Sequence, residues 1–352
     1  MTITQTPNAH ISPANQGPFS SFTQLCAESG LLTRPDGLED GDLCDGLSDP
    51  STLLRFLTAR QFDPDGAKKQ FQEASLFRQE KHINKLFDII EISEYEQTRQ
   101  LYPHWSGCRD KKGLPILMFD FAQLDKDALA RWEKTRKNAG WVNSQSGGSK
   151  KPNMLQLASV FHDSLVRFVL PLCSVMTDRP NPSVPITSST YLLDASALGL
   201  KQGWSVRFYA QELSWLLSTC YPETVERIFV CNAPSYFATI WKYLKSWVEP
   251  KTAEKIVVLM NAEVLPTLRE YIDDTNIPVV FGGGYSFKHG AVPCLEDGIL
   301  QQLNWNLSNG SLPPGPLKWV EDSDGKVTAL AVGSEDGSKR SKRIASIDRA
   351  QK

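Results

Sequence analysis

The chain has 352 residues, 41% of them hydrophobic, and its 38 basic and 40 acidic residues give a formal net charge of −2. This length fits one large or two ordinary domains, and the near-neutral charge gives no reason to expect nucleic acid as a partner. No apolar run approaches the roughly 20 residues of a membrane-spanning helix, and the first 20 residues lack Lys and Arg, which argues against a secretory or transit sequence.

Cysteine and histidine usage argues against disulfides and metals. The seven cysteines form no CxxC pair and their number is odd, so we expect buried thiols in a reducing, cytoplasmic compartment. The five histidines never recur at the spacing of zinc ligands. We therefore expect neither a metal site nor a cofactor.

Residues 1–48 are predicted to be a disordered or acidic N-terminal segment. Residues 1–20 are polar and have no helical period, which is typical of a disordered tail. Acidic residues then gather between Leu38 and Pro50 as a loop before a helix, with Asp49 or Ser51 as its N-cap. These carboxylates lack the spacing of a calcium loop, so a metal site is disfavoured.

Residues 49–98 are predicted to form a small helical module. Apolar residues recur there at helical spacing, in two stretches and a third that runs to Tyr95: Leu54, Leu57 and Phe62, then Ala67, Phe71, Ala74 and Phe77. Pro64 stands at the start of the second stretch, where its missing N–H costs little.

Residues 99–285 are predicted to be an α/β domain. Short apolar runs, typical of buried strands, alternate with longer helical stretches: 114–121, 189–194, 227–232, 255–260 and 277–282. This alternation favours right-handed crossovers and a mainly parallel, mixed sheet. The Gly/Ser/Lys-rich segment 136–152 interrupts the domain and is predicted to be a mobile surface loop; it lacks the motif of a phosphate-binding loop.

Residues 286–352 are predicted to be a C-terminal extension. Residues 317–333 have the pattern of a hairpin that turns at Asp324-Gly325. The basic residues that follow suggest a disordered, solvated tail, with weak attraction to an anionic membrane as the alternative: Lys339, Arg340, Lys342, Arg343 and Arg349.

Sequence motifs of catalysis are absent. We find no GxSxG, GxGxxG, HExxH or kinase motif set. A binding protein is therefore favoured over an enzyme.

The segment from Ala233 to Pro250 carries a broad apolar stripe. Its members lie at i, i+3, i+4, i+7, i+10 and i+11: Phe237, Ile240, Trp241, Leu244, Trp247 and Val248. Such a stripe can belong to an ordinary core-facing helix. It can also close a lipid-sized cavity or enter a membrane interface, where Trp and Lys are favoured.

Two further features have polar chemistry. Pro250 fits the first position of a helix, so the N–H and hydroxyl of Thr252, with Lys255 one turn later, could hold a phosphate. Glu223 follows a predicted helix and could accept hydrogen bonds from a polyol. A routine helix start and a solvated carboxylate are the alternatives.

Taken in order, these segments resemble the CRAL-TRIO lipid-binding family, specifically its fungal-type phosphatidylinositol/phosphatidylcholine transfer proteins. The resemblance covers roughly residues 50–285 and rests on these stretches: LLRFLTARQFD, DKKGLPIL, LPLC, YLLDASALGL, YPETVERIFVCNAP, WVEPKTAEKIVVL and IPVVFGGG. It implies a hydrophobic pocket that holds one phospholipid, no catalysis, and a helical gate from Phe237 to Trp247.

The resemblance also implies a headgroup site for phosphatidylinositol. The family's residues for this site map onto Arg60, Glu223, Thr252 and Lys255. Thr252 and Lys255 would bind the phosphodiester, Glu223 the inositol hydroxyls, and Arg60 would support the cluster. Gln61 stands where the family often has Lys, which slightly weakens the local positive potential.

The second ligand is left open by the resemblance. Members that bind phosphatidylcholine use a Ser-x-Thr pair on a pocket strand, whereas this chain has Ser189 and Tyr191. The phenol could exclude choline or favour a sterol, another apolar molecule, or haem.

We therefore expect a soluble, cytoplasmic protein that exchanges phosphatidylinositol for a second hydrophobic ligand at membranes and presents it to lipid kinases. The alternatives are a carrier of another apolar ligand, a lipid-acting hydrolase, and a lipid sensor that does not transfer its ligand.

Overall fold

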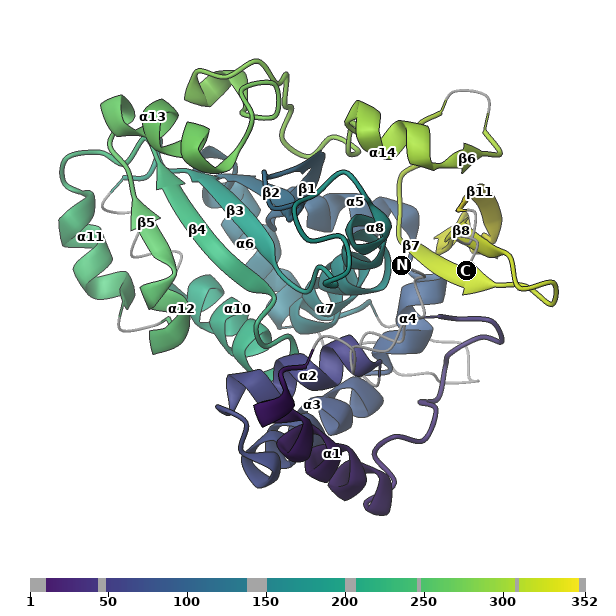
Figure 1. Ribbon diagram of the computed structural model, residues 1–352. Coiled ribbons are helices and arrows are strands. Elements are labelled where there is room, and N and C mark those ends of the chain that lie inside the picture. The colour runs from purple at the N-terminus through teal and green to yellow at the C-terminus, as the bar shows by residue number, and fades with distance from the viewer. Residues whose placement is uncertain are drawn as a thin grey trace.

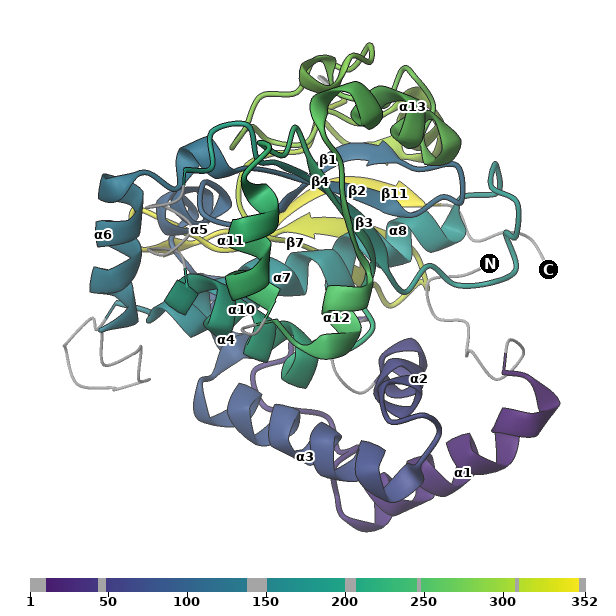
Figure 2. The same cartoon turned by 90° about the vertical axis from the view of Figure 1, so that its left-hand side faces the viewer.

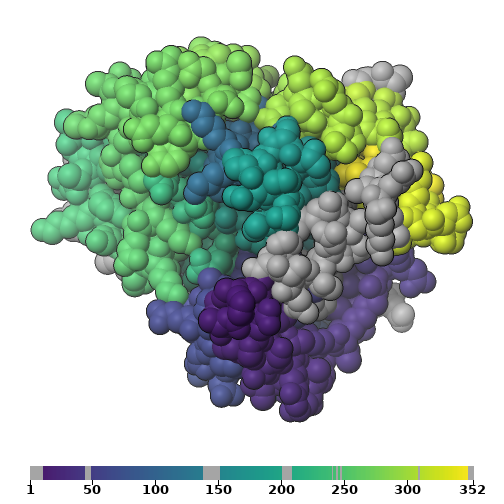
Figure 3. All heavy atoms as spheres, viewed as in Figure 1, coloured from purple at the N-terminus to yellow at the C-terminus, as the bar shows by residue number. Residues whose placement is uncertain are grey.

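The computed structural model describes residues 11–43, 49–137, 151–199, 207–245, 248–307 and 310–347. A helical module lies beneath an α/β lobe, and a small C-terminal sheet packs at the side of the lobe (Figure 1). The space-filling view shows the same division, with the N-terminal helices at the bottom and the C-terminal sheet at the right (Figure 3).

The helical module forms as predicted, but it begins earlier in the chain. Its helices are α1 (Pro13–Glu28), α2 (Pro50–Ala59), α3 (Pro64–Glu80), α4 (Ile83–Ile89) and α5 (Ile92–Arg99). Asp49 caps α2 by accepting the Thr52 N–H, one of the two caps predicted there. The Phe71 ring packs edge-on against Phe56 and Phe22, with centroids 5.2 and 6.0 Å apart, and so joins α3 to α2 and α1.

The predicted disorder of residues 1–20 is wrong from Pro13 onward. Helix α1 buries Phe19, Phe22 and Cys26, which follow one another at helical spacing and supply its apolar face. The acidic segment is also partly ordered, because Asp42 is buried and its backbone forms an isolated antiparallel β-bridge with Val320. Residues 1–10 and 44–48 lie outside the described part of the chain.

The lobe is built on one mixed, mainly parallel sheet of five strands in the order β1-β2-β3-β4-β5. Strand β1 runs antiparallel to β2, and the other pairs are parallel. The strands are β1 (His104–Arg109), β2 (Pro115–Asp120), β3 (Ser189–Asp194), β4 (Val225–Cys231) and β5 (Ile256–Val258). Four predicted strands are confirmed, which supports the expected α/β class.

The fifth prediction, a strand over 277–282, is wrong. Val279–Phe281 form the 3-10 turn η5, and Gly282 follows at φ 88°. Val279 and Val280 are 61% and 55% exposed, so an apolar run that looks like a buried strand lies at the surface. Strand β1 was not predicted, because its mixed residues show no apolar alternation.

The two faces of the sheet pack against different helices. On one face, Ile116, Leu192 and Phe229 contact Val264 and Leu268 of α13 (Asn261–Tyr271). Helices on the other face are α6 (Lys126–Arg136), α7 (Met154–Ser164), α10 (Arg207–Cys220) and α11 (Phe237–Leu244); Figure 2 shows several of them in front of the sheet. The shorter lobe elements are η2 (Phe121–Gln123), α12 (Pro250–Glu254) and α14 (Asp297–Gln302).

One long helical stretch crosses the core. Helix α7, the π-helical turn η3 (Leu165–Val169) and α8 (Leu170–Val175) form 22 continuous residues. By length and composition this stretch could span a membrane, contrary to the sequence-based expectation. Of its apolar window of 18 residues, however, 83% is buried inside the protein, as in the central helix of a folded core.

The C-terminal residues form a sheet, so the prediction of a disordered tail is wrong for most of them. Strands β7 (Leu317–Glu321) and β8 (Val327–Ala331) make the predicted hairpin. Beside β8 lies β11 (Lys342–Ile347), which buries Ile344 and Ile347 and also pairs with β6 (Asn304–Trp305). A smaller hairpin joins β9 (Ser334–Glu335) to β10 (Ser338–Lys339). Arg349 and most of the segment 136–152 lie outside the described residues.

Candidate functional site

A polar pocket of about 390 Å³ lies between the helical module and the lobe. All four residues predicted for the headgroup line it: Arg60, Glu223, Thr252 and Lys255. They come from three separate parts of the chain, namely the end of α2, the turn before β4, and helix α12 with its C-cap. Its volume lies in the range of roughly 300–1,000 Å³ that small-molecule pockets occupy.

Local backbone geometry brings these residues to the pocket. After α2, Gln61 and Phe62 both adopt positive φ, which reverses the chain and leaves Arg60 at the turn. Glu223 also has positive φ, at 57°, in the tight turn between α10 and β4. Non-glycine residues rarely adopt this conformation, which is concentrated at turns and functional sites.

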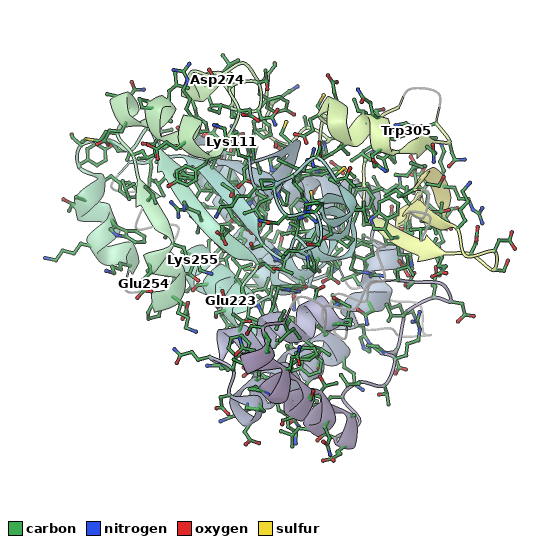
Figure 4. The ribbon with its side chains drawn as sticks, in the orientation of Figure 1. Lys111, Glu223, Glu254, Lys255, Asp274 and Trp305 are labelled. Atoms are coloured by element: carbon green, nitrogen blue, oxygen red, sulfur yellow. The ribbon has the colours of Figure 1, made fainter. Side chains whose placement is uncertain are left out.

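Lys255 and Glu223 form an ion pair at the pocket wall (Figure 4). The Lys255 Nζ lies 2.9 Å from Glu223 Oε2 and donates a second hydrogen bond of 2.7 Å to the Val225 carbonyl. Both side chains keep about a quarter of their surface exposed, so a ligand in the pocket can reach them.

Thr252 is engaged by a residue that the sequence analysis did not select. Glu249 is the N-cap of α12, and its Oε2 accepts both the Thr252 N–H, at 2.9 Å, and the Thr252 hydroxyl, at 3.2 Å. A carboxylate therefore occupies the start of this helix, where a phosphate was expected. Glu is not among the preferred N-cap residues, so the residue type carried little signal for this cap.

Arg60 and Lys251 provide two more cations. The Lys251 Nζ donates a 2.6 Å hydrogen bond to the Ala59 carbonyl, across the boundary between lobe and helical module. Arg60 is exposed, and within the described residues its guanidinium makes no ion pair or hydrogen bond. Lys251 was not selected from the sequence, because nothing local distinguishes it from a solvated lysine.

Arg55 holds the turn that carries Glu223. Its guanidinium is buried and donates to the Pro222 carbonyl at 3.1 Å and to the Thr52 hydroxyl at 2.8 Å. Burial lowers the pKa of Arg55 to about 10, against the opposing effect of nearby Asp49. Arg55 still carries its charge at neutral pH and adds positive potential behind the pocket.

The two residues predicted for a second ligand lie just behind this pocket, at the start of β3. The Ser189 hydroxyl donates to the Thr224 carbonyl at 2.9 Å. Tyr191 lies on the same side of the strand and is buried, which raises the pKa of its phenol to about 12. The phenol is therefore neutral at physiological pH.

Helix α11 (Phe237–Leu244) forms the first part of the segment predicted to be the gate, Phe237 to Trp247. Phe237 is buried, and its ring stacks with that of Trp241 at 6.5 Å. Both pack on a cluster at the sheet that includes Val230 and Ala195. Trp247 and the side chains of Ile240 and Leu244 lie outside what the structure describes.

Apolar side chains of β3 and β4 pack with residues of α10 and α11 on one side of the sheet. Register places Tyr191 beside Ile228 and Leu193 beside Val230, on one face of the sheet. Leu193 and Ile228 remain partly exposed, as do Leu213 and Leu217 of α10, which pack toward the same core.

These features suit an amphipathic ligand with a polar, anionic head and apolar chains. Cations and carboxylates together can bind a group that has both a negative charge and hydroxyls. Within the described ranges, no group of three or more His, Cys, Asp or Glu side chains is placed to hold a metal.

Two family models match this chain, and both belong to the CRAL/TRIO family. The model of the CRAL/TRIO domain matches residues 104–283, about half of the chain, and that of the CRAL/TRIO N-terminal domain matches residues 19–73. The second match includes residues 19–28 of α1, in agreement with the larger helical module.

Three relatives have similar sequences. "Phosphatidylinositol/phosphatidylcholine transfer protein SFH11" of Arabidopsis thaliana is 28% identical over 289 residues, which cover 82% of this chain and 68% of the relative. "SEC14 cytosolic factor" of Candida glabrata is 28% identical over 67% of this chain and 70% of its own. The protein of the same name from Kluyveromyces lactis is 25% identical over 75% of this chain and 85% of its own. The crystal structure of Sfh5 has a TM-score of 0.52 at 12% identity and covers 83% of this chain and 97% of its own, so it shows the fold alone.

Proposed function

The chain belongs to the CRAL/TRIO family, and from this premise we propose that it is a carrier that binds one phosphatidylinositol and transfers it between membranes. Relatives named as phosphatidylinositol/phosphatidylcholine transfer proteins and as cytosolic factors support this proposal and a cytosolic place of action.

The observation that carries the proposal is the pocket between the helical module and the lobe. Arg60, Glu223, Thr252 and Lys255 were selected by resemblance from three distant parts of the sequence, and they line one cavity. That cavity contains both cations and carboxylates, as an inositol phosphodiester requires.

The acyl chains would lie along the apolar sheet face that begins at the pocket. Val225 lines the pocket and opens β4, and three residues later Ile228 packs, partly exposed, against the apolar clusters of α10 and α11. Removing an acyl chain from water is favourable by about 0.8 kcal/mol of free energy per CH₂. The two acyl chains must therefore stay covered while the lipid is carried through water. The partly exposed Leu193 and Ile228 are the surfaces that such chains would cover.

Helix α11 would be the gate. In the structure Phe237 and Trp241 pack toward the sheet, and this would be the closed arrangement of the proposed gate. At a membrane the same apolar face would exchange protein contacts for lipid contacts, and the carried lipid could leave. The membrane contact would therefore be transient.

A second hydrophobic ligand would occupy the space beside Ser189 and Tyr191 during exchange. Buried Tyr191 is neutral, so it offers a hydrogen-bonding phenol rather than a counter-charge for choline. We propose no catalysis and no cofactor: the phosphatidylinositol is a cargo, presented to lipid kinases when the gate opens.

Transfer of labelled phosphatidylinositol between vesicles tests this function. We expect transfer by the wild-type protein and an at least ten-fold loss on Lys255→Ala or Glu223→Ala, since each removes a charged partner of the headgroup. The matched controls are Lys126→Ala and Glu263→Ala, which change exposed residues away from the pocket. Unchanged transfer in both pocket variants, with the fold intact, would refute the site.

A further inference from the structure

The residues expected to bind the phosphodiester are largely occupied within the protein. The Thr252 N–H and hydroxyl both donate hydrogen bonds to the Glu249 carboxylate. The Lys255 ammonium donates hydrogen bonds to Glu223 and to the Val225 carbonyl. A phosphate at this wall would meet the Glu249 carboxylate and would have to displace an ion pair.

Two other cations of the pocket lining are not occupied in this way. The Lys251 ammonium lies 2.6 Å from the Ala59 carbonyl, which belongs to the peptide bond that joins Ala59 to Arg60. Both Lys251 and Arg60 line the cavity, and neither forms an ion pair with a carboxylate within the described residues. Lys251 of the lobe thus reaches the backbone beside Arg60 of the helical module.

We propose that Lys251 and Arg60 form the phosphate subsite, and that the Lys255–Glu223 pair with Glu249 binds the ring hydroxyls. This inference rests on the proposed function and refines it, because it assigns Lys251 as a binding residue and moves the phosphate from the start of α12 to the boundary between the two modules.

The charges that line the pocket agree with this assignment. Three basic residues and two carboxylates face the cavity: Arg60, Lys251, Lys255, Glu223 and Glu249. One positive charge is in excess, and a phosphodiester brings one negative charge. Carboxylates accept hydrogen bonds from hydroxyls, whereas they repel a phosphate, so the phosphate is favoured beside Arg60 and Lys251 and the hydroxyls beside Glu223 and Glu249.

A competition experiment separates binding of phosphate from a structural role of Lys251. Fluorescent phosphatidylinositol bound to the full-length protein is displaced by myo-inositol 1-phosphate or by myo-inositol. The half-displacing concentration of myo-inositol, divided by that of myo-inositol 1-phosphate, measures recognition of the phosphate. We expect Lys251→Met to reduce this ratio about ten-fold or more, and Lys251→Arg to restore most of it. Lys126→Met, an exposed lysine on α6, is the control and should leave the ratio unchanged.

The outcomes are distinct. A Lys251→Met protein that binds both competitors more weakly, at an unchanged ratio, would show that Lys251 only clamps the modules and would overturn the inference. Equal displacement by both competitors in the wild-type protein would overturn it as well. Wild-type protein that does not bind the labelled phosphatidylinositol would instead defeat the proposed function.

Discussion

Tyr221 connects the headgroup turn to the buried centre of the molecule. Its hydroxyl lies 2.6 Å from Asp163 Oδ1 of α7, and Asp163 forms a bidentate ion pair with Arg78 of α3. Both charged side chains are at most 3% exposed. Glu223 is two residues beyond Tyr221, so this network also fixes the place of a proposed ligand residue.

Loss of Asp163 should therefore be costly. We expect Asp163→Ala to lower the free energy of unfolding by about 3–5 kcal/mol, because Arg78 would remain buried without its counter-charge. Asp274→Ala removes an exposed partner of Arg269 and should change stability far less, because water screens an exposed ion pair. Urea unfolding of both variants measures the difference, and equal losses would contradict the network's importance.

His162 makes the same region sensitive to acid. Burial, reinforced by the nearby charge of Arg55, lowers the pKa of His162 from 6.5 to about 3. Its Nε2 has no hydrogen-bond partner within the described residues. Between these two pH values the unfolded chain binds a proton that the folded protein does not, so stability must fall as the pH decreases.

The expected slope for this one group is about 1.4 kcal/mol per pH unit below pH 6.5. We predict that His162→Asn reduces the loss of unfolding free energy between pH 7 and pH 5 by about 2 kcal/mol. Urea titrations at the two pH values compare the variant with wild type, and an identical loss would show that other groups dominate.

Helix α11 can be judged as a whole element. Its apolar stripe is compatible with a core helix, and Phe237 does pack like one. Trp241 is only partly buried at the edge of the same cluster, over β4 and β5. A helix of this kind can move away from the sheet without disrupting the packing of the main core, which includes residues of α7 and α10.

Trp241→Asp separates the two roles of α11. If the helix is a gate, the charge should reduce vesicle-to-vesicle exchange of phosphatidylinositol at least ten-fold, with little change in thermal unfolding. Thermal melts and transfer rates are measured on the same preparation, with Lys242→Asp, off the stripe, as the control. Global unfolding of the Trp241 variant would identify α11 as an ordinary core helix.

The spacing of apolar residues predicted most helices and strands, because burial of one or both faces of an element determines which of its positions are apolar. The strands over 189–194 and 227–232 are apolar runs with two covered faces, and they form β3 and most of β4. The run at 277–282 failed since Val279 and Val280 are exposed at a turn, which hydrophobicity alone cannot reveal. The tail with β11 was missed because its charged residues conceal the buried Ile344 and Ile347.

The headgroup residues could be selected from the sequence only through resemblance. Residue types and spacing indicated Glu223, Thr252 and Lys255 separately, whereas their meeting with Arg60 depends on how the helical module packs on the lobe. Contacts across that boundary, such as Lys251 with Ala59 and Arg55 with Pro222, join residues far apart in the chain. No local pattern encodes them.

Charged residues also join the parts of the whole molecule. Lys318 of the C-terminal sheet is fully buried and pairs with Asp42 of the acidic segment at 2.8 Å and with Asp88 of α4 at 2.9 Å. Arg167, in the π-helical turn of the central helix, also contacts Asp42. The acidic segment and the C-terminal extension are thus integral to the fold.

Lys318→Met should consequently destabilise the protein by about 3–5 kcal/mol, because two buried carboxylates lose a shared partner. Lys326→Met, in the exposed turn of the same hairpin, should change stability by less than about 0.5 kcal/mol. Urea unfolding measures both variants. A neutral Lys318 variant would indicate that the C-terminal sheet is a dispensable attachment.

At the scale of the whole molecule, we propose that the protein encloses one phosphatidylinositol whose headgroup lies between the helical module and the lobe. Native mass spectrometry of the protein after incubation with mixed phospholipid vesicles detects the bound lipid. We predict one bound phosphatidylinositol per chain, retained by Lys126→Ala and lost by Lys255→Ala. A bound sterol or other apolar molecule in place of phosphatidylinositol, or equal retention of phosphatidylinositol by both variants, would contradict this proposal.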